Sequence, residues 1–266
     1  MSAKLTPKEA QDDDKQVGVS ALERAISVLS AFEADGKKLT LAEISAKTGL
    51  YKSTAFRLIQ SLVRYRLLRR FEDGSYSIGS GALRLASVYR HGDDIDPIIL
   101  PVMRELAGQC GESVGFFTIE DGRQVCRNVI DPGQMLHRYL QEGDALPLEA
   151  GSAGQVLLAF SGDHDEGAAF AEMVRRDMYC ATVKAQNPDI AGLAAPVFDA
   201  DQTIAGTLTI LGLRARMDER FVLANRGGLL AAASQITWKM GGDPTQLMAV
   251  AHQYRSAEAV LYHLRR

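Results

Sequence analysis

The order of secondary-structure elements predicted for residues 20–65 constrains this chain more than any other feature. Apolar residues recur at helical spacing after Ser20, which we interpret as the N-cap of a first helix. Thr40 and Glu43 have the spacing of a capping box, so a second, short helix begins there and stops at Thr48-Gly49. A third helix is predicted from about Tyr51 to Tyr65. Two helices joined by a tight turn are typical of a helix-turn-helix.

A hairpin follows these helices. Residues 67–71 and 76–78 are interpreted as two strands, and Asp73-Gly74 supplies the turn between them. Residues 80–90 are again helical, and His91-Gly92 ends that helix. We therefore predict a winged helix-turn-helix domain over 17–79 and a linker helix over 80–92. The polar, acidic segment 1–16 before them is expected to be a disordered tail.

The third helix has two chemically different sides. Its apolar residues gather on the side that must face the other helices, namely Ala55, Leu58, Ile59 and Leu62. The opposite side carries guanidinium, amide and hydroxyl groups, which hydrogen-bond base edges in a major groove. We expect Arg57 to contact a guanine, and Lys47 with other basic residues to neutralise phosphates. The predicted DNA-binding residues are Lys52, Ser53, Thr54, Arg57, Gln60, Arg64, Arg69 and Arg70.

The charge distribution points the same way. The net charge is only −3, but residues 1–90 carry 15 Lys and Arg against 10 Asp and Glu, and residues 91–266 carry 15 against 23. Residues 44–70 hold seven basic side chains and no acidic one. Such an asymmetry indicates that the basic N-terminal part of the chain binds a polyanion. A solvated basic face, or a three-helix protein-interaction module, is the alternative that charge leaves open.

From Glu112 the apolar pattern changes to a period of two. Strands are expected at 113–119, 124–129, 136–140, 193–198 and 204–211, and helices at 97–110, 151–160, 164–177 and 218–240. Asp243 is placed to cap a final helix. Helices around an antiparallel sheet predict an α+β domain over 93–241, followed by a helical extension over 242–266.

The composition excludes several classes of protein. Hydrophobic residues make up 46% of the chain, too many for disorder throughout. No apolar run approaches the roughly 20 residues that span a bilayer, and the N-terminal segment lacks the apolar region of a secretory signal. The three cysteines are widely spaced and indicate neither a disulfide framework nor a zinc site. We expect a cytoplasmic protein without a metal or other cofactor.

Several segments resemble signatures of the IclR family of bacterial transcriptional regulators. Residues 39–44, 48–50 and 52–58 are similar to its DNA-binding motif, and Gly143 with 146–154, and then 192–199, are similar to its effector-domain signatures. The resemblance covers roughly residues 17–241. It implies a GAF-like mixed α/β effector domain, a homodimer or dimer of dimers, and a small organic acid that changes the occupancy of a DNA operator. Repression is favoured over activation.

A glycine-rich run supplies the candidate effector site. Gly151 to Gly154 opens a predicted helix, where free backbone amides suit an anion, although a tight loop without a ligand has the same composition. The resemblance implies that Ser152, Ala153 and Gly154 hold a carboxylate and that Thr209 donates from a facing strand. It also implies that the remaining lining is Leu146, Thr182, Gly192 and Leu211. His137 and Arg138 are charge partners outside this set.

Thr182 and Gly192 stand where some relatives have a carboxylate and a cysteine, and the sequence departs from the family pattern at four further places near these motifs. They are Tyr51, Glu149, Gln155 and Leu211, where a proline, a histidine, a basic residue and a hydroxyl are usual. We therefore expect the frame of the pocket to persist while the ligand differs.

The segment Ala150-Gly151-Ser152-Ala153-Gly154 also matches a variant of the serine-hydrolase nucleophile turn. That chemistry needs a strand that leads into the serine, and a histidine base. Pro147 and Glu149 interrupt the lead-in, and His164, His252 and His263 lie in polar or helical contexts. We therefore predict that the chain is not an enzyme. A hydrolase using Ser152, and a ligand-binding protein that does not touch DNA, are the alternatives.

Overall fold

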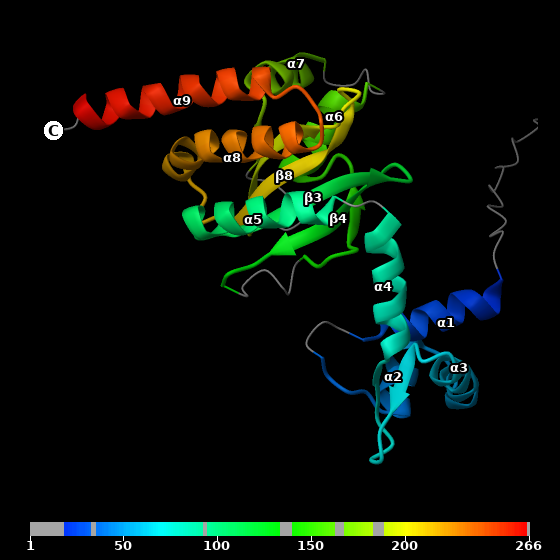
Figure 1. Cartoon of the computed structure of the whole chain (residues 1–266). Coiled ribbons are helices and arrows are strands. Elements are labelled where there is room, and N and C mark those ends of the chain that lie inside the picture. Colours follow the sequence, from blue (N-terminus) through cyan, green and yellow to red (C-terminus); the bar gives the residue numbers. More distant parts are fainter. Residues whose placement is uncertain are drawn as a thin grey trace, which may run out of the picture. The chain divides into compact units, whose positions relative to one another are not determined.

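The computed structural model describes residues 19–32, 36–92, 95–133, 140–162, 168–182 and 189–264. The chain forms two compact units, one up to Gly92 and one from Asp93 onward (Figure 1). Most of the strand predicted at 136–140, with His137 and Arg138, lies outside the described residues, as does His164. Among the described residues, no helix combines the length and apolar character needed to cross a bilayer.

Three helices build the core of the first unit. Helices α1 (Ser20–Ser30), α2 (Leu41–Thr48) and α3 (Lys52–Arg64) surround a small apolar cluster that includes Val28, Ile44 and Ile59. Thr40 caps α2 as predicted: its hydroxyl accepts from the Glu43 amide at 3.3 Å, and the Glu43 carboxylate accepts from the Thr40 amide at 2.8 Å. The Glu43 carboxylate accepts from both the amide and the hydroxyl of Thr40, and these two hydrogen bonds lower its pKa.

The start of α1 differs from the prediction by one residue. Ser20 is the first helical residue, and Val19, in an extended conformation, is the N-cap. The Val19 carbonyl accepts from the amides of Leu22 and Glu23, and no side chain caps the helix. The Ser20 cap was therefore wrong, because the backbone of the residue before it satisfies the first turn.

A hairpin and a fourth helix complete this unit. Strands β1 (Leu68–Arg70) and β2 (Tyr76–Ile78) pair antiparallel, and Leu39 bridges to Tyr76 on the other side. Gly74 has a φ of 79° in the turn. Helix α4 (Ser80–Gly92) follows directly. The predicted helix-turn-helix with a wing is therefore the observed order of elements.

The second unit is built on a six-stranded antiparallel sheet with the order β5-β4-β3-β8-β7-β6. The strands are β3 (Ser113–Glu120), β4 (Arg123–Ile130), β5 (Ala145–Pro147), β6 (Cys180–Thr182), β7 (Ile190–Phe198) and β8 (Ile204–Leu213). Neither β5 nor β6 had a counterpart among the predicted strands, because three residues give no measurable period. The α+β fold is confirmed.

Helices cover both faces of this sheet (Figure 1). Helices α5 (Asp96–Cys110) and α8 (Glu219–Lys239) pack on one face around a cluster that includes Phe116 and Ile210. Helix α6 (Gly151–Ser161) packs on the other face, next to α7 (Ala168–Asp177). Helix α9 (Thr245–Leu264) lies along α8, and the Asp243 carboxylate accepts from the Thr245 amide at its start, as expected. The layer between α6 and the sheet is where the predicted effector residues meet.

Candidate nucleic-acid interface and small-molecule site

Helix α3 separates its apolar and polar residues cleanly. Ala55, Ile59 and Leu62 are buried against α1 and α2, and Leu58 is half-buried beside them. The predicted base-reading residues on the other side, Ser53, Arg57, Gln60 and Arg64, are all exposed, as is Lys52, while Thr54 is half-buried. A guanidinium, an amide and a hydroxyl therefore stand together on one open helix face, which is the donor and acceptor set that base edges in a major groove require.

The turn before α3 is fixed by local hydrogen bonds. Gly49 takes a left-handed conformation with a φ of 69° at the end of α2. The Ser45 hydroxyl donates to the Leu50 carbonyl at 2.6 Å. Lys47, which was predicted to meet phosphate, directs its ammonium to the Ala31 carbonyl at the end of α1, at 3.2 Å. The Lys47 side chain therefore ties α2 to α1 while remaining exposed, as Lys52 is at the start of α3.

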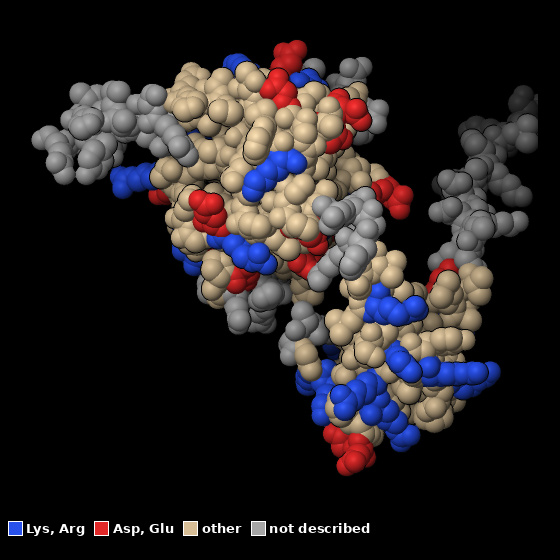
Figure 2. All heavy atoms as spheres, in the orientation of Figure 1, with Lys and Arg blue, Asp and Glu red and all other residues tan. Residues whose placement is uncertain are grey.

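The wing presents its cations on the strands and not at the tip. Arg69 and Arg70 are exposed on β1. The Arg69 guanidinium lies 4.8 Å from the centre of the Phe71 ring, and the Lys38 ammonium lies 3.7 Å from it. At the tip, the Asp73 carboxylate accepts from the hydroxyl and the amide of Ser75, which lowers its pKa. Lys and Arg side chains gather over this unit in the space-filling view (Figure 2).

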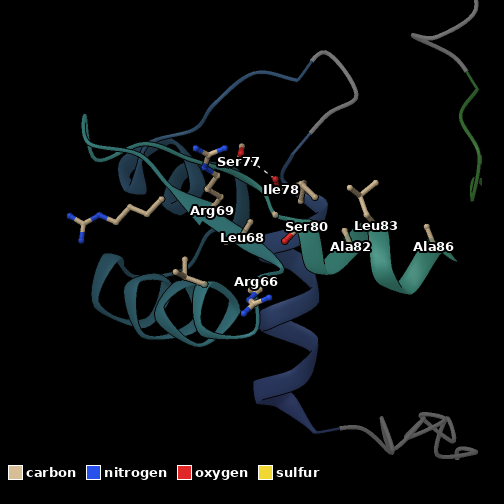
Figure 3. Close-up of a pocket in the computed structure, with 12 residues that line it drawn as sticks. Arg66, Leu68, Arg69, Ser77, Ile78, Ser80, Ala82, Leu83 and Ala86 are labelled. Carbon is tan, nitrogen blue, oxygen red and sulfur yellow. Dashed lines mark hydrogen bonds between the residues drawn. The ribbon is translucent and has the colours of Figure 1, made fainter. Parts of the chain in front are cut away.

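An open groove runs beside the wing (Figure 3). It has a volume of about 870 Å³, and its walls come from the end of α3, from β1 and β2, and from the start of α4. Leu83, Ala82 and Ala86 form the α4 side, and Arg66 and Arg69 lie opposite. Leu83 is 74% exposed and Val88 is 67% exposed, so α4 carries apolar side chains that this unit does not bury.

In the second unit, the first turn of α6 is held in place by a buried glutamine. Gln124 on β4 is only 1% exposed, and its amide nitrogen donates to the Pro147 carbonyl at 2.7 Å and to the Ala150 carbonyl at 2.6 Å. The loop before α6 is thereby fixed to the sheet. No side chain of the described residues caps α6, so its first-turn amides keep the partial positive charge of a helix N-terminus.

Two glycines allow close contacts at this turn. A Cβ on Gly154 would lie 1.9 Å from the Leu148 carbonyl oxygen, and a Cβ on Gly192 would lie 2.4 Å from the Ser152 hydroxyl. Ser152 therefore sits directly against the backbone of β7. At Gly154 the close atom belongs to the backbone, so only glycine fits there, whereas a side chain at Gly192 would displace the Ser152 hydroxyl.

The sheet register brings most of the predicted effector residues together. Thr182 and Leu211 are the cross-strand partners of Gly192, and Thr209 pairs with Ala194, the next residue on the same face of β7. Ser152 is 2% exposed and Thr209 is fully buried. Their hydroxyls, and that of Thr182, have no hydrogen-bond partner among the described residues. Ala153 is buried in the adjoining apolar cluster, and Leu146 packs against it.

The sequence reasoning missed two buried polar residues of this layer. Gln124 is a polar residue at the start of an alternating strand, and Thr207 is a second threonine on the inward face of β8. Each breaks an apolar pattern, and that break was the available signal. The described residues contain no group of three His, Cys, Asp or Glu side chains that could hold a metal ion.

The Ser152 hydroxyl makes no hydrogen bond to a base within the described part of the chain. A serine nucleophile requires a histidine in hydrogen-bond reach. The geometry therefore gives the hydrolase alternative no support.

Comparisons with family models match both units. The model of the IclR helix-turn-helix domain matches residues 21–71. The model described as "Bacterial transcriptional regulator IclR C-terminal" matches residues 88–174.

Curated relatives are regulators of the same kind. The chain is 32% identical over 155 residues to the HTH-type transcriptional repressor AllR of Klebsiella pneumoniae, across 56% of this chain and 55% of AllR. It is 25% identical over 226 residues to the HTH-type transcriptional regulator KipR of Bacillus subtilis, across 76% of this chain and 90% of KipR. The match therefore spans about half the length of AllR and most of KipR.

Solved structures share the fold. The Thermotoga maritima IclR crystal structure has a TM-score of 0.68 at 17% identity, over 83% of this chain and 98% of that one. An IclR homolog from Microbacterium hydrocarbonoxydans, complexed with 4-hydroxybenzoate, has a TM-score of 0.63 at 21% identity, over 86% of this chain and all of that one.

Proposed function

This chain belongs to the IclR family of bacterial transcriptional regulators. From that premise we propose that it binds an operator in double-stranded DNA and that a small metabolite changes its affinity for the operator. The observation that carries the proposal is the exposed polar side of α3, with Ser53, Arg57 and Gln60 on one open face. A relative named as a repressor favours repression. Such a protein acts on the chromosome, in the cytoplasm.

Helix α3 reads the bases in this proposal. Arg57 makes a bidentate contact to a guanine, Gln60 and Ser53 contact neighbouring base edges, and Arg64 lies further along the helix. Lys52 and Thr54 meet phosphate at the helix N-terminus, where the helix dipole favours an anion. Arg69 and Arg70 hold the backbone beside the wing, because both are exposed on β1 and the acidic tip would repel phosphate.

Two copies of the chain bind together. The apolar residues of α4 and the groove beside them, including Leu83 and Ile78, are exposed in one copy and supply a surface for a second (Figure 3). A two-fold pair places its two α3 helices in major grooves about 34 Å apart, or a multiple of that distance. The operator is therefore palindromic or repeated. A dimer of dimers is the larger assembly.

The effector binds between α6 and the sheet. The first-turn amides of α6 and the hydroxyls of Ser152, Thr182 and Thr209 hold an acidic group, and Leu146 and Leu211 line the apolar side. A relative of the same fold is complexed with 4-hydroxybenzoate, a small organic acid. The ligand changes DNA affinity only through its different affinity for two conformations, with a coupling of about 1–3 kcal/mol.

Fluorescence anisotropy with the DNA upstream of the chain's own gene tests this function. We expect a specific duplex to bind at least about a thousand-fold more tightly than a scrambled one at physiological salt. At least one member of a panel of small carboxylic acids and semialdehydes should change that affinity about 5- to 150-fold. A protein that binds acids but no duplex at low salt would instead be a ligand-binding protein without a role on DNA.

The dimer has its own test. Leu83→Glu places a carboxylate on the exposed face of α4. Arg84→Glu is the control, because it places a carboxylate at the neighbouring exposed position with a larger change in net charge. Sedimentation should show that Leu83→Glu weakens self-association more than Arg84→Glu does. Equal effects would place the pairing surface elsewhere.

A further inference from the structure

The layer under α6 contains one more buried hydroxyl than the proposed effector site uses. Thr207 on β8 is fully buried, and its hydroxyl has no hydrogen-bond partner among the described residues, like those of Ser152 and Thr209. A buried hydroxyl without a partner weakens a fold, since it has lost water and gained nothing in return. A hydrogen bond to the Thr207 hydroxyl from a bound group would therefore stabilise the second unit.

The sheet register places Thr207 next to the proposed site. Thr209 lies between Gly115 of β3 and Ala194 of β7, and Thr207 lies between Phe117 and Pro196 of the same two strands. Alternate residues of a strand face the same side, so both hydroxyls face α6, about 7 Å apart along β8.

The surroundings of the two hydroxyls differ. Thr209 is near the first turn of α6, because its neighbour Leu211 pairs with Gly192, which touches Ser152. Thr207 is flanked by Phe117, which belongs to the same apolar cluster as Leu157 of α6. Neither Phe117 nor Pro196 has a polar side-chain atom. These two neighbours therefore offer no side-chain partner to Thr207, and a polar group of a bound molecule would supply one.

We infer that Thr207 is a specificity-determining residue and that the effector is a two-ended organic acid. The inference rests on the proposed effector site. The acidic end of the effector lies at the first turn of α6 and at Thr209. A hydroxyl or carbonyl of the same effector, about 7 Å further along β8, pairs with Thr207. Because a threonine hydroxyl both donates and accepts, either group satisfies it. An acid with one polar end leaves Thr207 unpaired and binds more weakly.

Matched acids and matched variants test the inference. The probes are 6-hydroxyhexanoate against hexanoate and 4-hydroxyphenylacetate against phenylacetate, titrated by calorimetry into the wild-type protein, Thr207→Val and Thr209→Val. In the wild type, the hydroxylated member of at least one pair should bind about tenfold or more tightly than its partner. Thr207→Val should remove this preference, and Thr209→Val should weaken both members.

Three results separate the possible failures. A preference that survives Thr207→Val overturns the role of Thr207. Binding of none of the four acids, by a protein that responds to other acids of the wider panel, overturns the two-ended effector. If the protein responds to no acid of the whole panel, the proposed effector function itself is contradicted. The stability of the ligand-free variants then decides whether the Thr207 hydroxyl lacks a partner.

Thermal unfolding without ligand provides that measurement. Thr207→Val keeps the shape of the side chain and removes an unpaired hydroxyl, so the melting temperature of the second unit should rise by about 2–4 °C. The control is Thr237→Val, because Thr237 is also fully buried but its hydroxyl accepts from the Phe198 amide at 3.1 Å. That variant should melt at a lower temperature. A similar fall for Thr207→Val would mean a structural partner for its hydroxyl and would overturn the inference.

Discussion

The two units place the polar groups of their proposed sites in opposite ways. In the first unit, Ser53, Arg57 and Gln60 stand in the open on α3, above a small core that does not depend on them. In the second unit, the hydroxyls of Ser152 and Thr209 are buried and have no hydrogen-bond partner in the part of the chain that the structure describes. Exposed polar groups cost the fold little, whereas buried unpaired ones weaken it. Substitutions in the exposed site should therefore leave the first unit folded, whereas substitutions in the buried site also change the packing of the second unit.

The largest expected effect comes from disturbing that packing at Gly154. Gly154→Ala would place a methyl group against the Leu148 carbonyl oxygen, so we expect the second unit to lose about 3 kcal/mol or more. Gly228→Ala is the matched control, since no atom lies within 4 Å of its Cβ position on α8, and alanine there should be neutral or stabilising. Chemical denaturation of both variants measures the difference. Similar curves for the two would show that the first turn of α6 tolerates repacking.

The next effect is on the open interface of the first unit. Arg57→Ala should cost about 1–3 kcal/mol in operator binding and relax the preference at one base pair. Lys52→Ala should weaken all sequences alike and reduce the salt dependence by about one ion. Anisotropy titrations over a set of operator variants at several salt concentrations distinguish the two. Unchanged base selectivity in Arg57→Ala would mean that another side of α3 faces the bases. Neither variant should lower the melting temperature.

A smaller effect concerns the capping box of α2. Thr40→Ala should destabilise the first unit by about 0.5–2 kcal/mol, because the first turn of α2 loses its cap. The pKa of Glu43 is lowered in the folded state, so its contribution is complete above the ordinary glutamate pKa and is lost as the pH falls through the folded-state value. Melting curves from pH 6 to pH 3 should therefore show a steeper acid loss in the wild type than in Glu43→Gln. If the melting temperatures of the two proteins fall in parallel, the capping box is not the cause of the acid sensitivity.

The smallest perturbation is a labelling experiment on the second unit. Burial raises the pKa of the Cys180 thiol to about 12, and it also raises the pKa of the fully buried Cys126. Cys110 is only half-buried and should react first with a thiol reagent at pH 8, because the thiolate is the reactive form. Mass spectrometry of the labelled peptides gives the order. Early labelling of Cys126 would indicate that the layer under α6 opens readily.

The sequence determined the first unit almost completely. The capping box at Thr40, the left-handed Gly49 and the two sides of α3 follow from spacings of three or four residues, so each could be predicted without knowing what the helix packs against. Only the start of α1 was misjudged, by one residue at Ser20. The exposed interface was predictable for the same reason, since a helix that buries one side must expose the other.

The second unit depended on tertiary structure. The sequence predicted most of its strands, and resemblance to the family suggested the effector residues, but only the register of β7 and β8 places Thr182, Gly192 and Thr209 together beneath α6. Gln124 and Thr207 were missed because their importance lies in what they touch, and those neighbours are distant in sequence. Local spacing fixes a helix and its exposed side. A buried cluster exists only after long-range strand pairing has brought its members together.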